Sequence, residues 1–84
     1  MDNQSYLQFI QGGSRSYGDG VTAYVDDNPA FTAKVDVPKR RSIKGNSYVI
    51  KPGTRHVKVV SNGQTLYEKD VVIGNQETKK IVLP

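Results

Sequence analysis

The 84-residue chain has no cysteine and no tryptophan, and its single histidine is His56. Without cysteine there is neither disulfide nor thiol chemistry, and one histidine cannot assemble a structural zinc centre. No run of apolar residues approaches the ~18 needed to span a membrane. Residues 1–9, MDNQSYLQF, lack the basic region and apolar run of a signal peptide. We therefore expect one domain over residues 1–84, without a transmembrane segment.

Helix signals are nearly absent, and the apolar residues recur with the period of two that is typical of half-buried strands. In FTAKVDV, residues 31–37, the odd-numbered positions carry the apolar residues, and in VTAYV, residues 21–25, the same alternation appears. In RHVKVV, residues 55–60, Val57 and Val59 are expected inward and His56 and Lys58 outward. Further runs that suit a pleated surface cover residues 5–10, 47–50, 65–73 and 78–83.

Turn residues separate these runs at the spacing expected of an all-β domain. Asn62-Gly63 is the strongest hairpin signal, because both central positions of a type I′ turn need a positive φ. Residues 12–20, GGSRSYGDG, contain four glycines and are predicted to form a glycine-rich loop. The pattern predicts an antiparallel β-sandwich of about seven short strands.

Positive charge is concentrated in one stretch of the chain. Residues 34–58 contain eight Lys or Arg and one acid, Asp36, whereas the whole chain has a net charge of +4. The simpler interpretation is a solvated loop whose charges protect a sheet edge from unwanted strand pairing. The functional interpretation is attraction to a polyanion, either an envelope polymer or a nucleic acid. The densest part is the basic loop predicted at residues 38–46, with Lys39, Arg40, Arg41 and Lys44.

The second half of the chain resembles PEGA domains and related cell-envelope modules. Residues 48–84, YVIKPGTRHVKVVSNGQTLYEKDVVIGNQETKKIVLP, have the order of such modules: an apolar strand, a Pro-Gly turn, a strand of alternating Val, and a Gly-containing turn before the last two strands. Residues 21–35, VTAYVDDNPAFTAKV, are similar to their first hairpin. The Pro-Glu-Gly-Ala string that names the family is missing, with NPAF roughly in its place.

The resemblance covers residues 20–84 and implies a transthyretin-like or immunoglobulin-like β-sandwich. It also implies a non-catalytic accessory or adhesive module of a bacterial exported protein, often a lipoprotein, that is periplasmic, secreted or on the cell surface. The histidine that such modules often carry two residues after the turn glycine is replaced by Arg55, and His56 follows on the opposite face. The families share no catalytic residue that could be carried over to this chain.

The sequence shows no pattern for catalysis. A nucleophilic triad requires His56 beside a serine and an acid, but Ser14 and Ser16 fall in the glycine-rich loop and no G-x-S-x-G elbow is present. A weak surface calcium site is the alternative to a turn at residues 26–28, Asp-Asp-Asn, because calcium prefers such oxygen donors. Asx side chains are common in turns and the EF-hand spacing is not met, so we predict a turn, and neither a metal nor a cofactor.

We therefore expect a non-enzymatic, monomeric module that binds a protein partner or an anionic envelope polymer or glycan. The alternative is a small basic β-barrel that binds nucleic acid. Single-strand binders interleave bases with aromatic platforms, and only Tyr48 lies within the basic stretch, so this alternative is less favoured. The hypothesised contact residues are Arg15, Tyr17, Lys39, Arg40, Arg41 and Lys44.

Overall fold

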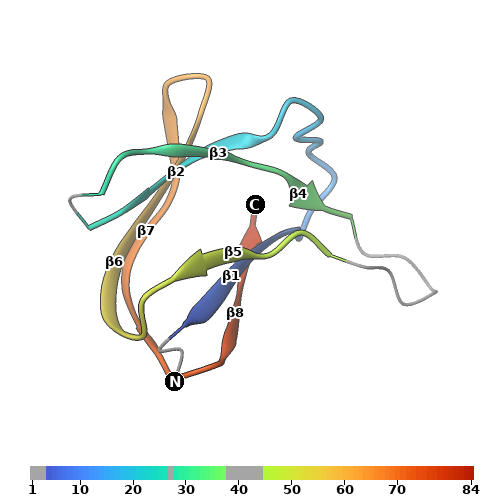
Figure 1. Ribbon diagram of the computed structural model, residues 1–84. Coiled ribbons are helices and arrows are strands. Elements are labelled where there is room, and N and C mark those ends of the chain that lie inside the picture. The colour runs from blue at the N-terminus through green and yellow to red at the C-terminus, as the bar shows by residue number, and fades with distance from the viewer. Residues whose placement is uncertain (1–3, 27, 38–44) are drawn as a thin grey trace.

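The computed structural model describes residues 4–26, 28–37 and 45–84, and it confirms the prediction of an all-β chain (Figure 1). The described residues contain strands and turns but no helix, and hence no helix that could cross a membrane. The strands in chain order are β1 (Ser5–Gln11), β2 (Val21–Val25), β3 (Phe31–Ala33), β4 (Val35–Asp36), β5 (Tyr48–Ile50), β6 (Gly53–Ser61), β7 (Gln64–Ile73) and β8 (Thr78–Leu83).

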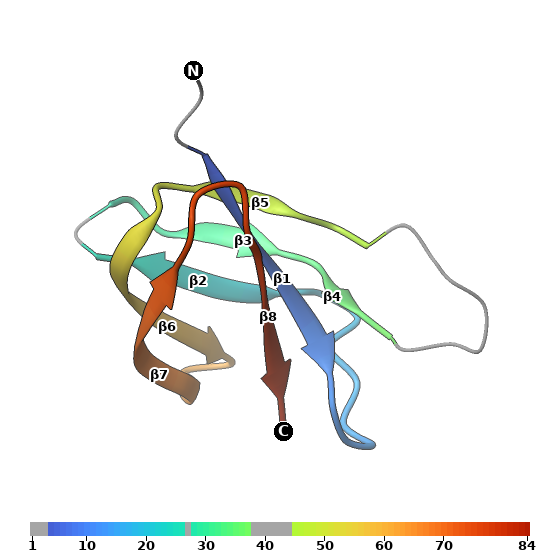
Figure 2. The same cartoon turned by 90° about the horizontal axis from the view of Figure 1, so that it is seen from below.

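The strands form two sheets, as predicted for a sandwich. One, here called the β6 sheet, has the order β3-β2-β6-β7 and is antiparallel throughout. The other, the β1 sheet, is built around β1, which pairs with β8 in parallel along one side. On its other side β1 pairs first with β5, antiparallel, and then with β4, parallel. Figure 2 shows β1 and β8 running side by side in the same direction.

The run at residues 31–37 is divided between the two sheets, so the described residues form eight strands where about seven were expected. β3 pairs with β2, whereas β4, after Lys34, pairs with β1. The backbone N–H of Lys34 donates a hydrogen bond of 2.6 Å to the Tyr48 hydroxyl. The Tyr48 ring packs on Phe31 and Phe9, with centroids 5.4 and 6.0 Å apart. This aromatic anchor holds the corner at which the chain passes from one sheet to the other.

The predicted alternation of side chains is confirmed where the two sheets face each other. Val57 and Val59 are fully buried while His56 is exposed, and Val21, Ala23 and Val25 are buried while Tyr24 is exposed. Both sheets contribute to one apolar cluster, and the molecule is only 17 Å across its shortest axis. The largest fully buried apolar side chains are Phe9, Leu7, Ile73, Ile81, Leu83, Val57 and Val59.

The hairpin predicted at Asn62-Gly63 joins β6 to β7. The φ angles of these residues are 51° and 77°, as a type I′ turn requires, and Ser61 faces Gln64 across the turn. The register then shifts by one residue, so that Leu66 has no counterpart in β6. This β-bulge determines which side chains of β7 lie beside His56.

Candidate functional site

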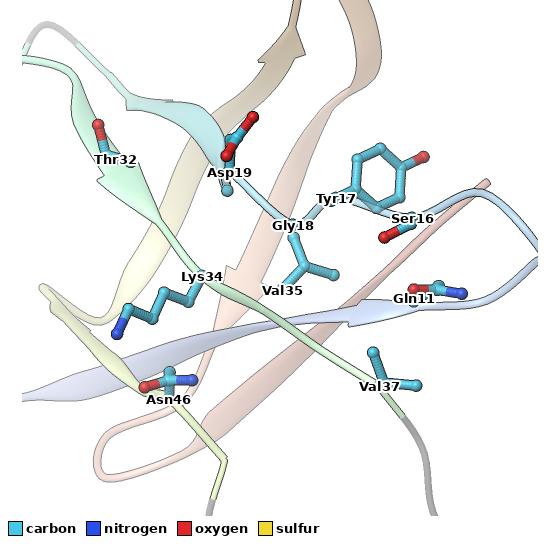
Figure 3. Close-up of a pocket in the computed structure, with 11 residues that line it drawn as sticks. Gln11, Ser16, Tyr17, Gly18, Asp19, Thr32, Lys34, Val35, Val37 and Asn46 are labelled. Atoms are coloured by element: carbon cyan, nitrogen blue, oxygen red, sulfur yellow. The ribbon is translucent and has the colours of Figure 1, made fainter.

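The main cavity of the described residues lies between the glycine-rich loop and the corner that joins β3 to β4 (Figure 3). Its volume is about 440 Å³. Lys34 and Asn46 lie at one end of it, and Gln11 and Tyr17 lie at the other. The side chains that line it are Gln11, Ser16, Tyr17, Asp19, Thr32, Lys34, Val35, Val37 and Asn46.

Two of the predicted contact residues, Arg15 and Tyr17, hold the glycine-rich loop in place. Tyr17 is only 7% exposed, and its hydroxyl donates a hydrogen bond to the carbonyl of Pro84, just beyond β8. The Arg15 guanidinium lies 5.4 Å from the centre of the Tyr17 ring, and its Nη1 donates to Gln64 Oε1 at 3.4 Å. The loop is thus attached both to the end of β8 and to the tip of the β6–β7 hairpin. Tyr17 belongs to the core and to the cavity wall, whereas Arg15 is exposed.

The other predicted contact residues, Lys39, Arg40, Arg41 and Lys44, lie outside the described residues. The chain on either side of residues 38–44, here called the basic segment, is described. Val37 comes before the basic segment, and Gly45 and Asn46 come after it. Val37 and Asn46 both line the main cavity, which Tyr17 of the glycine-rich loop also lines. The structure therefore brings the glycine-rich loop and both ends of the basic segment to one cavity.

The two ends of the basic segment are joined through the carboxylate of Asp36. Its Oδ2 accepts hydrogen bonds from Gln8 Nε2 and the backbone N–H of Asn46, and its Oδ1 accepts one from Asn46 Nδ2, each at 2.8 Å. Partial burial raises the pKa of Asp36, but these three hydrogen bonds outweigh that effect and lower it. A Cβ on Gly45 would lie 1.9 Å from Gln8 Nε2 and 2.7 Å from Asp36 Oδ2, so a larger residue here would displace the side chains of this network.

The cavity wall combines apolar side chains, among them Val35 and Val37, with polar groups that could bind a ligand. The described residues that line it include one cation, Lys34, and one anion, Asp19. The remaining polar side chains, such as Ser16 and Thr32, are neutral and can both donate and accept hydrogen bonds. The lining residues of the described chain include no histidine that could activate Ser16 as a nucleophile. Such a surface suits hydroxyl groups with a negative charge placed near Lys34.

A cluster of charged side chains surrounds His56 on the outer face of the β6 sheet. Nδ1 of His56 lies 2.7 Å from Oδ1 of Asp70, and Nε2 lies 2.8 Å from Oε2 of Glu68. Two carboxylates can each accept a hydrogen bond from the ring only if both nitrogens are protonated. The hydrogen bond to Asp70, and then that to Glu68, accordingly raises the pKa of His56. The bulge at Leu66 creates the cluster, since the unshifted register would place Lys69 opposite His56.

Asp26 forms the turn predicted at residues 26–28. Its φ is 51°, its Oδ1 accepts the backbone N–H of His56 at 2.8 Å, and its Oδ2 accepts Arg55 Nη1 at 3.0 Å. The His56 hydrogen bond, followed by the Arg55 pair, lowers the pKa of Asp26. Asp27 lies outside the described residues. No three His, Asp or Glu side chains of the described ranges are arranged to hold a metal ion.

Comparisons with protein-family models, curated proteins and solved structures find no match for this chain. The resemblance of residues 20–84 to PEGA domains therefore stays a prediction.

Proposed function

We propose that this chain is a non-catalytic binding module of an exported or surface protein, and that its main cavity takes a segment of an anionic, hydroxyl-rich envelope polymer such as an acidic glycan. One observation carries the proposal. The glycine-rich loop and both ends of the basic segment border the same cavity, although they are distant in sequence. Two features that sequence reasoning treated separately therefore become parts of one site.

The charge near the cavity favours an anionic ligand. Lys34 lines the cavity, and the adjoining segment carries Lys39, Arg40, Arg41 and Lys44 within six residues. Asp36, the one acid in residues 34–58, directs both carboxylate oxygens to Gln8 and Asn46, so these oxygens are already engaged within the protein. Positive charge attracts an anionic polymer from a distance, and the neutral lining groups of the cavity then hydrogen-bond to its hydroxyls.

The surroundings of His56 support a role without catalysis. A general base must offer an unprotonated nitrogen near neutral pH, and two carboxylates beside the ring favour the protonated form. His56 also lies on the outer face of the β6 sheet and does not line the main cavity. Its partners make it part of a surface ion cluster.

The described residues that line the cavity offer no exposed aromatic ring on which a nucleic-acid base could stack. Binding of single strands depends on exposed rings, each of which contributes about 1–3 kcal/mol per stacked base. Tyr17, the aromatic residue that lines the cavity, is 7% exposed. Tyr24, on the outer face of the β6 sheet, is 40% exposed, and the Lys58 ammonium lies 5.9 Å from its ring centre.

Calorimetric titration with an acidic oligosaccharide, oligogalacturonate, tests the proposal. Replacing Lys39, Arg40 and Arg41 with Ser is expected to weaken binding at least tenfold and to leave the melting temperature nearly unchanged. A matched variant in which Lys51, Lys58 and Lys69 become Ser loses the same charge elsewhere and should bind within about threefold of the parent. Equal weakening in both triple variants would show that binding depends only on the net charge of the protein and not on the basic segment. Tighter binding of single-stranded DNA than of any acidic glycan would support the nucleic-acid alternative instead.

A further inference from the structure

The free edges of the two sheets are protected to different degrees. Proteins protect edge strands by making them very short, by bulges and by charged residues. β3, β4 and β5 have no more than three residues each. β7 is long, but it contains the bulge and the consecutive charges Glu68, Lys69 and Asp70. β8 has six residues and no bulge, and among the described strands it pairs only with β1.

The pairing of β8 with β1 fixes which of its backbone groups point away from the sheet. The carbonyl of Glu77 accepts from Tyr6, and the carbonyl of Leu83 accepts from Gly12. Alternate residues of a strand direct their N–H and C=O groups to opposite sides, so the odd-numbered residues of β8 bond to β1. The N–H and C=O groups of Thr78, Lys80 and Val82 therefore point to the outer edge.

The side chains of β8 continue the two faces of the sheet to this edge. Ile81 and Leu83 are each 1% exposed and point into the core. Thr78, Lys80 and Val82 are exposed on the outer face, with Val82 59% exposed. A strand added here would place alternate apolar side chains beside Ile81 and Leu83, and its other side chains beside Lys80.

We propose that the outer edge of β8 binds an extended segment of a partner protein, with an acidic side chain beside Lys80 and apolar side chains on its inner face. Backbone hydrogen bonds to Thr78, Lys80 and Val82 supply the general affinity, and Lys80 selects for negative charge. The β8 strand of a second copy fits less well, because it would bring its own Lys79 and Lys80 to the edge. Like charges that face each other across a sheet destabilise the pairing. This site is separate from the main cavity.

Amide hydrogen exchange with a probe peptide tests the proposal directly. The probe is a nine-residue peptide of alternating Val and Glu, and the control has Lys in place of Glu. In the free protein, the amides of Thr78, Lys80 and Val82 should exchange much faster than those of Lys79 and Ile81, and the Glu peptide should slow them at least tenfold. Protection of those three amides in the free protein would overturn the proposal, since the edge would then already be covered.

Variants separate backbone pairing from charge. Val82→Pro removes an outward N–H, which an edge strand tolerates, and it should abolish peptide binding measured by fluorescence anisotropy. Val72→Pro is the matched control, since Val72 holds an outward position on β7 and is 72% exposed. It should leave the affinity unchanged.

Lys80→Glu should weaken binding of the Glu peptide at least tenfold and favour the Lys peptide. Equal binding of both peptides to the parent protein would contradict the charge selection. If the fraction of dimer rises with protein concentration and falls when the peptide is added, a second copy occupies the edge. That result would overturn the proposed partner. Melting curves of each variant establish that it is folded.

Discussion

Replacing Asp36 with Asn tests the network that joins the ends of the basic segment. The carboxylate accepts three hydrogen bonds, each of 2.8 Å, two on Oδ2 and one on Oδ1. Asparagine has nearly the same shape, but only one of its two terminal atoms accepts, so its NH₂ group would face a donor. One or two hydrogen bonds to a charged group are lost, and at a half-buried site each contributes about 1 kcal/mol.

The expected destabilisation is therefore about 1–2 kcal/mol, which corresponds to a fall in Tm of roughly 4–16 °C for a domain of this size. Differential scanning calorimetry at pH 7 measures it, with Asp19→Asn as the control because it also removes one negative charge, from the cavity wall, without touching this network. Since the network lowers the pKa of Asp36, its contribution is present above about pH 3.8 and is lost as the pH falls through the lowered pKa. A change in Tm below about 2 °C, equal to that of the control, would show that these hydrogen bonds do not stabilise the fold.

Three further predictions concern the same fold. Gly45→Ala should lower the free energy of unfolding in urea by about 1–3 kcal/mol, because its Cβ would lie 1.9 Å from Gln8 Nε2; full stability would contradict the described packing. The hydrogen bonds that raise the pKa of His56 stabilise the fold fully below about pH 6.5, and this contribution is lost as the pH rises through the pKa of the folded state. The Tm of the parent should therefore fall as the pH rises from about 6.5 through that pKa, whereas the Tm of His56→Gln should not. Leu7→Ala, at a fully buried position, should cost about 2–5 kcal/mol by chemical denaturation; a cost below 1 kcal/mol would mean that β1 is not central to the core.

Most of the strands could be predicted from the sequence, because each has one buried and one exposed face. The division of residues 31–37 into β3 and β4 at Lys34 could not be predicted. The alternation of apolar and polar residues continues through Lys34 and does not specify which strand each part pairs with. The parallel pairing of β1 with β8 could not be predicted either, because side chains alternate in the same way in parallel and antiparallel strands. The turn at Asn62-Gly63 was predicted because its backbone conformation has a strict residue requirement.

The candidate site was predictable in composition but not in arrangement. The glycine-rich loop contains a buried residue, Tyr17, although four glycines in nine residues indicate an exposed loop; the aromatic residue within it was the one available signal. The partners of Asp36 come from β1 and from the segment before β5, so they depend on the tertiary fold. The carboxylates beside His56 depend on a bulge of one residue at Leu66, which no turn rule predicts.

We have proposed that the main cavity, which Val37 and Asn46 line from either side of the basic segment, binds an anionic hydroxyl-rich polymer. A ¹⁵N–¹H correlation titration of the whole chain with oligogalacturonate tests it most directly. We expect the largest and saturable shifts at the amides of Ser16, Lys34 and Asn46, and small shifts along β7. The largest shifts around Tyr24 and Lys58 on the outer face of the β6 sheet, with none at the cavity, would contradict it.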